Sequence, residues 1–301
     1  MKLKLTRRQF GQVAAATTVA AAVGTLINRT VAQTPPVVIL GVSDSVPSTD
    51  DSLTPEVDST EDIDEIANIT VTSILRPIVV QSLVLATGVK TTTLTTAPIL
   101  EPGEQLSGFA ALKDGTLVVS TNTFGKNAVQ PTRLIILGAS PRTVTVSEIK
   151  RQEALLSLLT RRDGSLGGIV GKKNGTPPLT IVTINLQNGE ITEENKLPGN
   201  LRVTSAAECP DGNLYGIVTE RRGETNLELI DKGKGQTTPL SFNSQPWNSG
   251  FSGLVCSSSN QLIALGARRY ESPKYLHTID KNSGVITRLT DFDVATIAIQ
   301  I

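Results

Sequence analysis

Apolar and polar residues alternate in short runs through the last two thirds of the chain, and each run ends at a tight-turn pair. A period of two is typical of strands that bury one face. Asp-Gly between alternating runs predicts a two-residue type I′ hairpin, in which both turn residues have positive φ. These pairs are Asp114-Gly115, Asp163-Gly164, Asp211-Gly212 and Ser259-Asn260, which lie 49, 48 and 48 residues apart. A fixed period of this length predicts a structural repeat.

A second strand-turn-strand motif follows each of these hairpins. It reads LTIVTINLQNGEIT at 179–192 and LHTIDKNSGVITRL at 276–289. Its turn glycines Gly189, Gly235 and Gly284 keep the same period. Four strands in each unit of about 48 residues are the signature of a β-propeller blade. Abundant Val, Ile and Thr at a period near two argue against helices.

The two ends of the repeat region are complementary. Residues 69–96 supply outer strands without an inner strand, and residues 292–301 resemble an inner strand that stops before its turn. We therefore expect an all-β, five-bladed propeller over residues 67–301, closed by pairing of the last ten residues beside the segment near Val71. Closure removes the free edges that an open solenoid, the alternative, would expose.

The blade sequences resemble those of the broad NHL and YVTN-like class of propellers. The resemblance rests on PDGNLYGIV at 210–218, followed by LELIDKGKGQ at 227–236. The WD40 pairs Trp-Asp and Gly-His are missing from the repeats. Because this class includes enzymes, carriers and scaffolds, the resemblance implies a fold and little about function.

The first 32 residues have the layout of a secretory signal: five basic residues, no acidic residue, and a weakly apolar stretch from Val13 to Ile27. Thr6-Arg7-Arg8-Gln9-Phe10 resembles the twin-arginine signal, although Gly11 stands where that pattern has Leu. The resemblance implies that the twin-arginine translocase exports the folded protein to the periplasm or another extracytoplasmic compartment. Cleavage after Ala32 would leave no stable membrane span, whereas an uncleaved segment would act as an anchor.

Residues 33–66 carry nine acidic and no basic residues, which leaves 23 basic and 19 acidic residues in 67–301. A polar segment of one charge cannot bury enough apolar surface to fold, so 33–66 is predicted to be a disordered spacer. The propeller itself is mildly basic.

The residue inventory disfavours several classes of function. One Trp, three Tyr and six Phe are few for stacking on bases, so we expect no nucleic-acid partner. One His and two Cys give no zinc or haem pattern, so we predict no cofactor. His277 falls on a predicted third strand away from the channel, which disfavours a Ser-His-Asp triad and favours an ordinary strand residue.

Hydroxyl residues recur on the predicted inner strands, which line the channel of a propeller. They either form a polar ring around water or supply the small side chains that converging strands need, and both interpretations can hold together. The hydroxyl residues are Ser107, Ser157, Ser205, Ser252 and Thr296.

Charged residues stand near the predicted channel mouth, just before these hydroxyls. The carboxylates Glu104, Glu153 and Asp293 suit glycoside hydrolysis or a hard cation, but they can also serve solubility alone. Arg202 occupies the corresponding place in another blade.

Basic pairs end three consecutive second strands and add positive charge to the same face. They can attract a polyanion, a phosphate ligand or an acidic membrane surface, receive the acidic spacer, or only solvate the loops. Trp247 is predicted on this face, as a stacking residue for a ligand or as a packing anchor. The pairs are Lys172-Lys173, Arg221-Arg222 and Arg268-Arg269.

Cys209 and Cys256 end adjacent inner strands at nearly equivalent positions. Export permits a disulfide, but we expect neighbouring inner strands to lie too far apart for one, so we expect two buried thiols.

The sequence favours an exported, non-enzymatic propeller that binds a partner protein or an anionic ligand at its channel-mouth face. A glycan-acting hydrolase or lyase that uses the mouth carboxylates is the alternative. A redox protein is a third hypothesis, which no cofactor motif supports.

Overall fold

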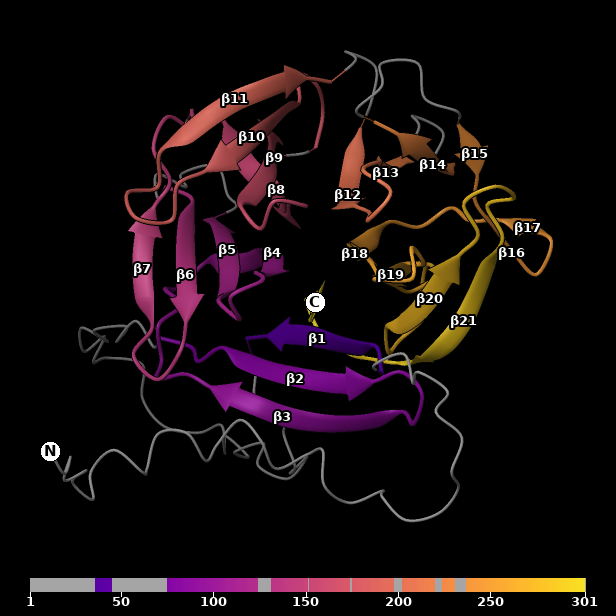
Figure 1. The fold of residues 1–301 in the computed structure, drawn as a ribbon, viewed down its shortest axis with the longest axis horizontal. Coiled ribbons are helices and arrows are strands. Elements are labelled where there is room, and N and C mark those ends of the chain that lie inside the picture. The colour runs from indigo at the N-terminus through magenta and orange to yellow at the C-terminus, as the bar shows by residue number, and fades with distance from the viewer. Residues whose placement is uncertain are drawn as a thin grey trace, which may run out of the picture. The chain divides into compact units, whose positions relative to one another are not determined.

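The chain folds into five four-stranded antiparallel sheets around a central axis, and one small hairpin lies on the rim (Figure 1). This confirms the predicted all-β, five-bladed propeller. None of the described residues forms a helix long and apolar enough to cross a membrane. The predicted export signal lies outside the described residues. The computed structural model describes residues 36–44, 75–123, 131–150, 152–173, 175–197, 202–219, 224–230 and 237–300.

Each blade runs from an inner strand beside the axis to an outer strand on the rim. Adjacent inner strands contact one another all the way round, in the order β22, β4, β8, β12 and β18. The first blade comprises β22 (Thr296–Ile299), β1 (Val38–Ser43), β2 (Val79–Val84) and β3 (Val89–Thr95), and the second β4 (Glu104–Ala111), β5 (Leu117–Thr123), β6 (Arg133–Leu137) and β7 (Arg142–Thr145). The third comprises β8 (Glu153–Thr160), β9 (Leu166–Lys172), β10 (Thr180–Ile184) and β11 (Ile191–Lys196). The fourth comprises β12 (Val203–Glu208), β13 (Leu214–Thr219), β14 (Thr225–Leu229) and β15 (Thr238–Pro239), and the fifth β18 (Phe251–Cys256), β19 (Leu262–Gly266), β20 (Tyr275–Ile279) and β21 (Ile286–Asp291). The rim hairpin is β16 (Ser241–Phe242) with β17 (Gln245–Pro246).

The two ends of the chain close the ring, as predicted, but through a different strand. β22 pairs antiparallel with β1, from Ile39 opposite Ile299 to Val42 opposite Thr296. The expected partner near Val71 was wrong, and residues 69–74 lie outside the described residues. β1 falls within 33–66, so part of the predicted disordered spacer is a strand. Its residues, VILGVS, are mostly apolar and β-branched, and Ile39 and Val42 are fully buried.

The hairpins between inner and second strands occur where predicted, but their turns are not type I′. Only the second residue of each pair has positive φ, for example 85° at Gly115 and 78° at Gly212. Gly115 N donates to Leu112 O, and Leu112 N donates to Thr116 O. This is a type I turn followed by a glycine bulge, which needs only one left-handed residue.

Two outer turns, at Gly189 and Gly284, each lock a blade to the one before it. Gly189 lies in the turn between β10 and β11, and its carbonyl accepts a hydrogen bond from Ser147 N at 2.9 Å. A Cβ atom on Gly189 would lie 2.0 Å from Thr145 O, and one on Gly284 would lie 2.1 Å from Pro239 O. Both glycines have positive φ. Glycine is therefore required where the outer turn of one blade meets the outer strand of its neighbour.

The long outer strands are protected against pairing with other chains. Three outer strands each have a bulge that shifts their register with the neighbouring strand: β3 against β2, β11 against β10, and β21 against β20. A bulge twists an edge strand and interrupts its row of free backbone groups, which lowers the risk of edge-to-edge aggregation.

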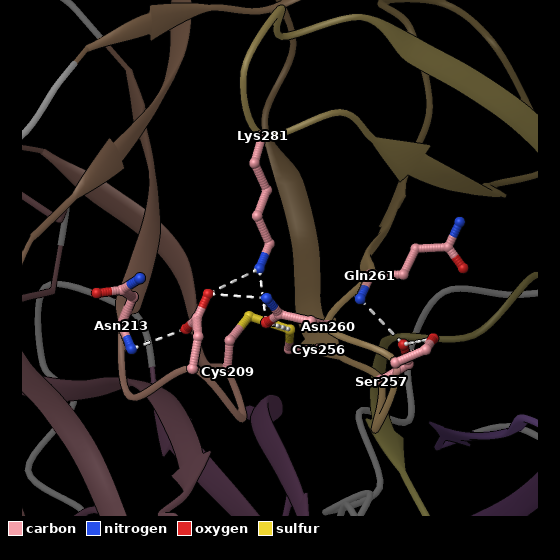
Figure 2. The surroundings of a disulfide bond; sticks show 9 residues. Cys209, Asn213, Cys256, Ser257, Asn260, Gln261 and Lys281 are labelled. Carbon is pink, nitrogen blue, oxygen red and sulfur yellow. Dashed lines mark hydrogen bonds and ion pairs between the residues drawn. A yellow bond between two sulfur atoms is a disulfide. The ribbon is translucent and has the colours of Figure 1, made fainter.

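A disulfide joins the inner strands of the last two blades, which corrects the prediction of two free thiols. Cys209 and Cys256 have Cα atoms 5.2 Å apart, so the inner strands lie closer together at this end than we expected. Beside the bond, Asn260 donates to the Asp211 carboxylate at 2.9 Å and Lys281 pairs with it at 3.4 Å (Figure 2). The two blades are therefore joined covalently and by polar contacts at the same place.

We predict that replacing both cysteines, Cys209→Ala with Cys256→Ala, lowers the free energy of unfolding by about 4 kcal/mol, because the bond closes a long loop in the unfolded chain. Chemical denaturation measures the change. Reduction of the wild-type disulfide should cost a similar amount, and reductant should leave the double variant unaffected. A loss below about 1 kcal/mol would show that the bond contributes little to the ring.

Candidate functional site

The predicted charged residues lie at one end of the ring, where the inner strands begin; we call it the entrance end. Glu153 at the start of β8 pairs with Lys172 at the end of β9. In the same way, Phe251 at the start of β18 pairs with Gly266 at the end of β19. The antiparallel register thus places the mouth carboxylates and the basic pairs on the same face.

Glu104 is at the entrance end but is enclosed by its own blade. Its carboxylate accepts hydrogen bonds from Thr121 Oγ1 at 2.8 Å, Arg133 Nε at 2.6 Å and Glu101 N at 2.7 Å. The side chain is 1% exposed. Burial raises the pKa of Glu104, but the hydrogen bonds from Arg133, Glu101 N and Thr121 outweigh it and hold the pKa below its usual value. Glu104 therefore stabilises the blade and is closed to a ligand, contrary to its predicted role.

The other mouth carboxylates do not form a metal site with Glu104. Glu153 is half-buried, accepts a hydrogen bond from Lys150 N at 3.3 Å and lies 3.8 Å from its ammonium group. Asp293 is exposed and interacts electrostatically with Lys274. The described parts of the chain contain no group of three or more His, Cys, Asp or Glu placed to hold a metal ion.

The channel hydroxyls occupy two levels, which corrects the single predicted ring. A bulge in each of four inner strands leaves one residue unpaired: Ser107, Leu156, Thr204 and Ser252. The bulge hydroxyls donate to carbonyls of the second strand, as in Ser107 to Ser120 O at 3.2 Å and Thr204 to Ile217 O at 3.3 Å. Ser157 and Ser205 lie one residue later. Thr204 was not among the predicted hydroxyls, although it lies one period before Ser252.

The hydroxyls surround a constriction rather than a ligand pocket. The five predicted hydroxyl residues and Thr204 line one cavity of about 10 Å³, which has room for about one water molecule. Ser205 Oγ is buried there without a hydrogen-bond partner among the described residues. Phe109, Leu158 and Leu254 also line a neighbouring cavity of about 40 Å³. The channel is therefore narrow along the stretch that these residues line.

Exposed basic residues gather at the entrance end of β9 and β12. Lys172 is exposed, whereas Lys173 donates to Thr123 O at 2.9 Å and is held against the neighbouring blade. Arg202 is exposed, and its side chain lies beside Gly175 in the loop that follows β9. Two adjacent blades therefore contribute to one basic patch.

Of the last two basic pairs, the structure describes only Arg268-Arg269. Arg269 is exposed and lies over the ring of Tyr270, 5.0 Å from its centroid. Arg268 instead lies 5.4 Å from the centroid of Phe242, in the rim hairpin. Arg221 and Arg222 lie outside the described residues.

Trp247 packs inside its blade and is not exposed as a stacking platform at the channel mouth. It is 1% exposed and stacks on Phe251, with ring centroids 4.9 Å apart and an interplanar angle of 10°. The prediction placed it correctly before an inner strand, but the preceding hairpin folds over the indole.

His277 lies on β20, the third strand of its blade, as predicted, and is fully buried. Burial, and then the charge of Arg288, lower its pKa to about 4. Backbone groups of Tyr275 and Ala264 oppose this shift, but neither ring nitrogen has a partner of hydrogen-bond geometry among the described residues. The imidazole is therefore neutral at neutral pH.

Comparison with known proteins supports the fold and no particular activity. No protein-family model matches the sequence, and the search of curated proteins gives no match. A protein of unknown function from Dyadobacter fermentans superposes with a TM-score of 0.51 at 9% identity, over 72% of each chain. A protein of unknown function from Bacteroides caccae gives a TM-score of 0.44 at 11% identity, over 88% of this chain and 98% of that one. At such identities the likeness concerns the fold alone.

We predict that Glu104→Gln lowers the free energy of unfolding by about 3 kcal/mol at pH 7, because it leaves Arg133 without its buried partner. A carboxyl whose pKa is lowered on folding stabilises the fold above its unfolded pKa and loses this effect as pH falls through the folded pKa. The difference between variant and wild type should therefore shrink below pH 4.5, the ordinary value for Glu.

The matched control is Asp293→Asn, an exposed carboxylate at the same end, which should change stability by less than about 0.5 kcal/mol. Chemical denaturation at a series of pH values measures both variants. Equal effects of the two substitutions would contradict a structural role for Glu104.

Proposed function

We propose that the protein is an exported β-propeller that binds an anionic ligand, or an anionic segment of a partner protein, on the basic patch at its entrance end. The observation that carries the proposal is an imbalance of charge. Lys172, Arg202 and Arg269 are exposed and form no ion pair among the described residues. Of the mouth carboxylates, Glu104 and Glu153 are paired with cations and only Asp293 is exposed. Free cations on a protein surface attract anions and can form charge-assisted hydrogen bonds with them.

Export is supported by two independent features. The twin-arginine-like motif at Thr6 to Phe10 suits transport of a folded domain. The Cys209–Cys256 disulfide suits an oxidising compartment outside the cytoplasm, because cytosolic thiols are normally kept reduced.

Binding is preferred to glycan hydrolysis because the carboxylates needed for that reaction are not available together. Glycoside hydrolysis uses two carboxyl groups that flank the scissile bond. Glu104 is buried and already accepts four hydrogen bonds from three residues, so it cannot protonate or attack a sugar without opening its blade.

The test is binding of polyphosphate to the mature protein, measured by calorimetry at two salt concentrations. We predict that the triple variant Lys172→Gln, Arg202→Gln, Arg269→Gln weakens binding by about tenfold, since each exposed ion pair contributes about 0.2–1 kcal/mol. The wild-type affinity should also fall with salt, because salt screens exposed charges.

The control removes the same charge from the opposite end of the ring. Lys113, Arg142 and Arg162 are exposed near the hairpin turns there, and replacing all three with Gln should change the affinity less than twofold. Equal weakening by both triple variants would mean that net charge alone drives binding, and would refute a defined entrance-end site.

A further inference from the structure

The β16–β17 hairpin and β21 lie on the rim, away from the central axis (Figure 1). An open groove is lined by residues of both. It has a volume of about 510 Å³, which is within the range of small-molecule sites. Residues 241–244 of the hairpin form one wall, and residues 285–288 form the other.

The hairpin is built to hold two aromatic residues in place. Trp247 N donates to Leu240 O at 2.8 Å and closes its base. Asn243 and Ser244 both have positive φ, 51° and 60°, which is the signature of a rigid type I′ turn. The described parts of the other blades contain no similar hairpin. It places Phe242 in the wall of the groove and Trp247 behind it.

Behind Phe242 lies a concentration of unpaired polar atoms. The described residues contain six buried side-chain nitrogen or oxygen atoms without a hydrogen-bond partner, and four of them are here: Trp247 Nε1, both ring nitrogens of His277, and Arg288 Nε. An unsatisfied buried polar group costs about 1–3 kcal/mol, and a bound species that accepts hydrogen bonds from these nitrogens would remove that cost.

These nitrogens belong to one cluster. The rings of Trp247 and His277 have centroids 5.2 Å apart, and His277 faces Arg288 across the β20–β21 pair. The Phe242 ring meets both edge-on, 6.1 Å from Trp247 and 6.2 Å from His277. Phe242 also lines the groove, so its side chain is the partition between the groove and the cluster.

The chemistry of the cluster favours an anion with acceptor oxygens. Trp247, the neutral imidazole and Arg288 Nε offer three N–H donors and only one acceptor. The guanidinium groups of Arg268 and Arg288 lie 5.4 and 5.2 Å from the Phe242 centroid. Glu271 pairs with Arg288 at 2.6 Å, which leaves one positive charge uncompensated.

We propose that Phe242, Trp247, His277 and Arg288, with Arg268 beside them, form a rim site that binds a small aromatic carboxylate. The carboxylate accepts hydrogen bonds from the three nitrogens, and the flat apolar body packs among the aromatic rings. The ligand enters from the groove when the Phe242 side chain turns aside. This site is separate from the entrance-end patch and does not depend on it.

The protein reports on this site directly, because Trp247 is its only tryptophan. Titration with benzoate should change the tryptophan emission saturably, with half-saturation at or below about 1 mM. Benzamide, a neutral molecule of the same shape, should have little effect at the same concentration. No saturable change with benzoate up to about 10 mM, or equal responses to both compounds, would overturn the proposal.

Two variants and two controls locate the response. Arg288→Lys keeps the charge but removes the Nε donor, and His277→Phe keeps a ring but removes both nitrogens; each should weaken benzoate binding at least about tenfold. Arg142→Lys, a matched change on another blade, should leave it unchanged. The entrance-end triple variant should also leave it unchanged, so failure of either site is distinguishable from failure of the other. Wild-type affinity in both rim variants would overturn the assignment.

Discussion

Pairing of β22 with β1 is the contact on which the rest of the structure depends, because it places the two ends of the described chain in one blade. β22 contacts the inner strands β4 and β18 on either side, so the ring of inner strands is complete only when it is in place. Ile39, Val42, Ile297 and Ile299 are buried at this junction. Each buried side chain of this kind contributes about 1.5–3 kcal/mol, which is ample to hold four residue pairs together.

The junction between the last two blades departs most from the repeat. It holds the disulfide at the end of the inner strands, the additional hairpin at the rim, and the only His and only Trp of the chain. A covalent bond near the axis secures the two blades where the rim hairpin has been inserted. The same junction holds four buried side-chain nitrogens without a hydrogen-bond partner. Elsewhere in the described residues, the only buried side-chain nitrogen or oxygen atoms without a partner are the hydroxyl oxygens of Ser205 and Thr219. The proposed rim site therefore lies where the packing of the blades is least regular.

The repeat, the five blades and the closure could be predicted because they depend on local signals, namely alternation and turn residues at a fixed period. β1 was missed because its apolar run is short and lies in a segment whose composition is otherwise acidic and polar. The Glu104–Arg133 pair was missed because the two residues are distant in sequence and meet only when β4 and β6 share a blade. The disulfide depended on the separation of inner strands, which no sequence pattern reports.

In the candidate sites, too, contacts between residues distant in sequence could not be predicted. Exposure of Lys172 and Arg202 follows from their positions at loop ends, and the basic character of the entrance end was foreseen on that ground. The rim site was not foreseen, since Phe242 and Arg288 come from different elements and are brought together by an inserted hairpin. Trp247 and His277 were each considered alone, and only the fold shows that they are neighbours.

Amide hydrogen exchange of the two chain ends, followed by mass spectrometry, tests the ring closure most directly. Peptides that cover β1 and β22 should exchange together, and as slowly as those from the central strands, because closing strands open only when the whole ring unfolds. Exchange of the β22 peptide within seconds, at the rate of a frayed terminus, would contradict the closed ring.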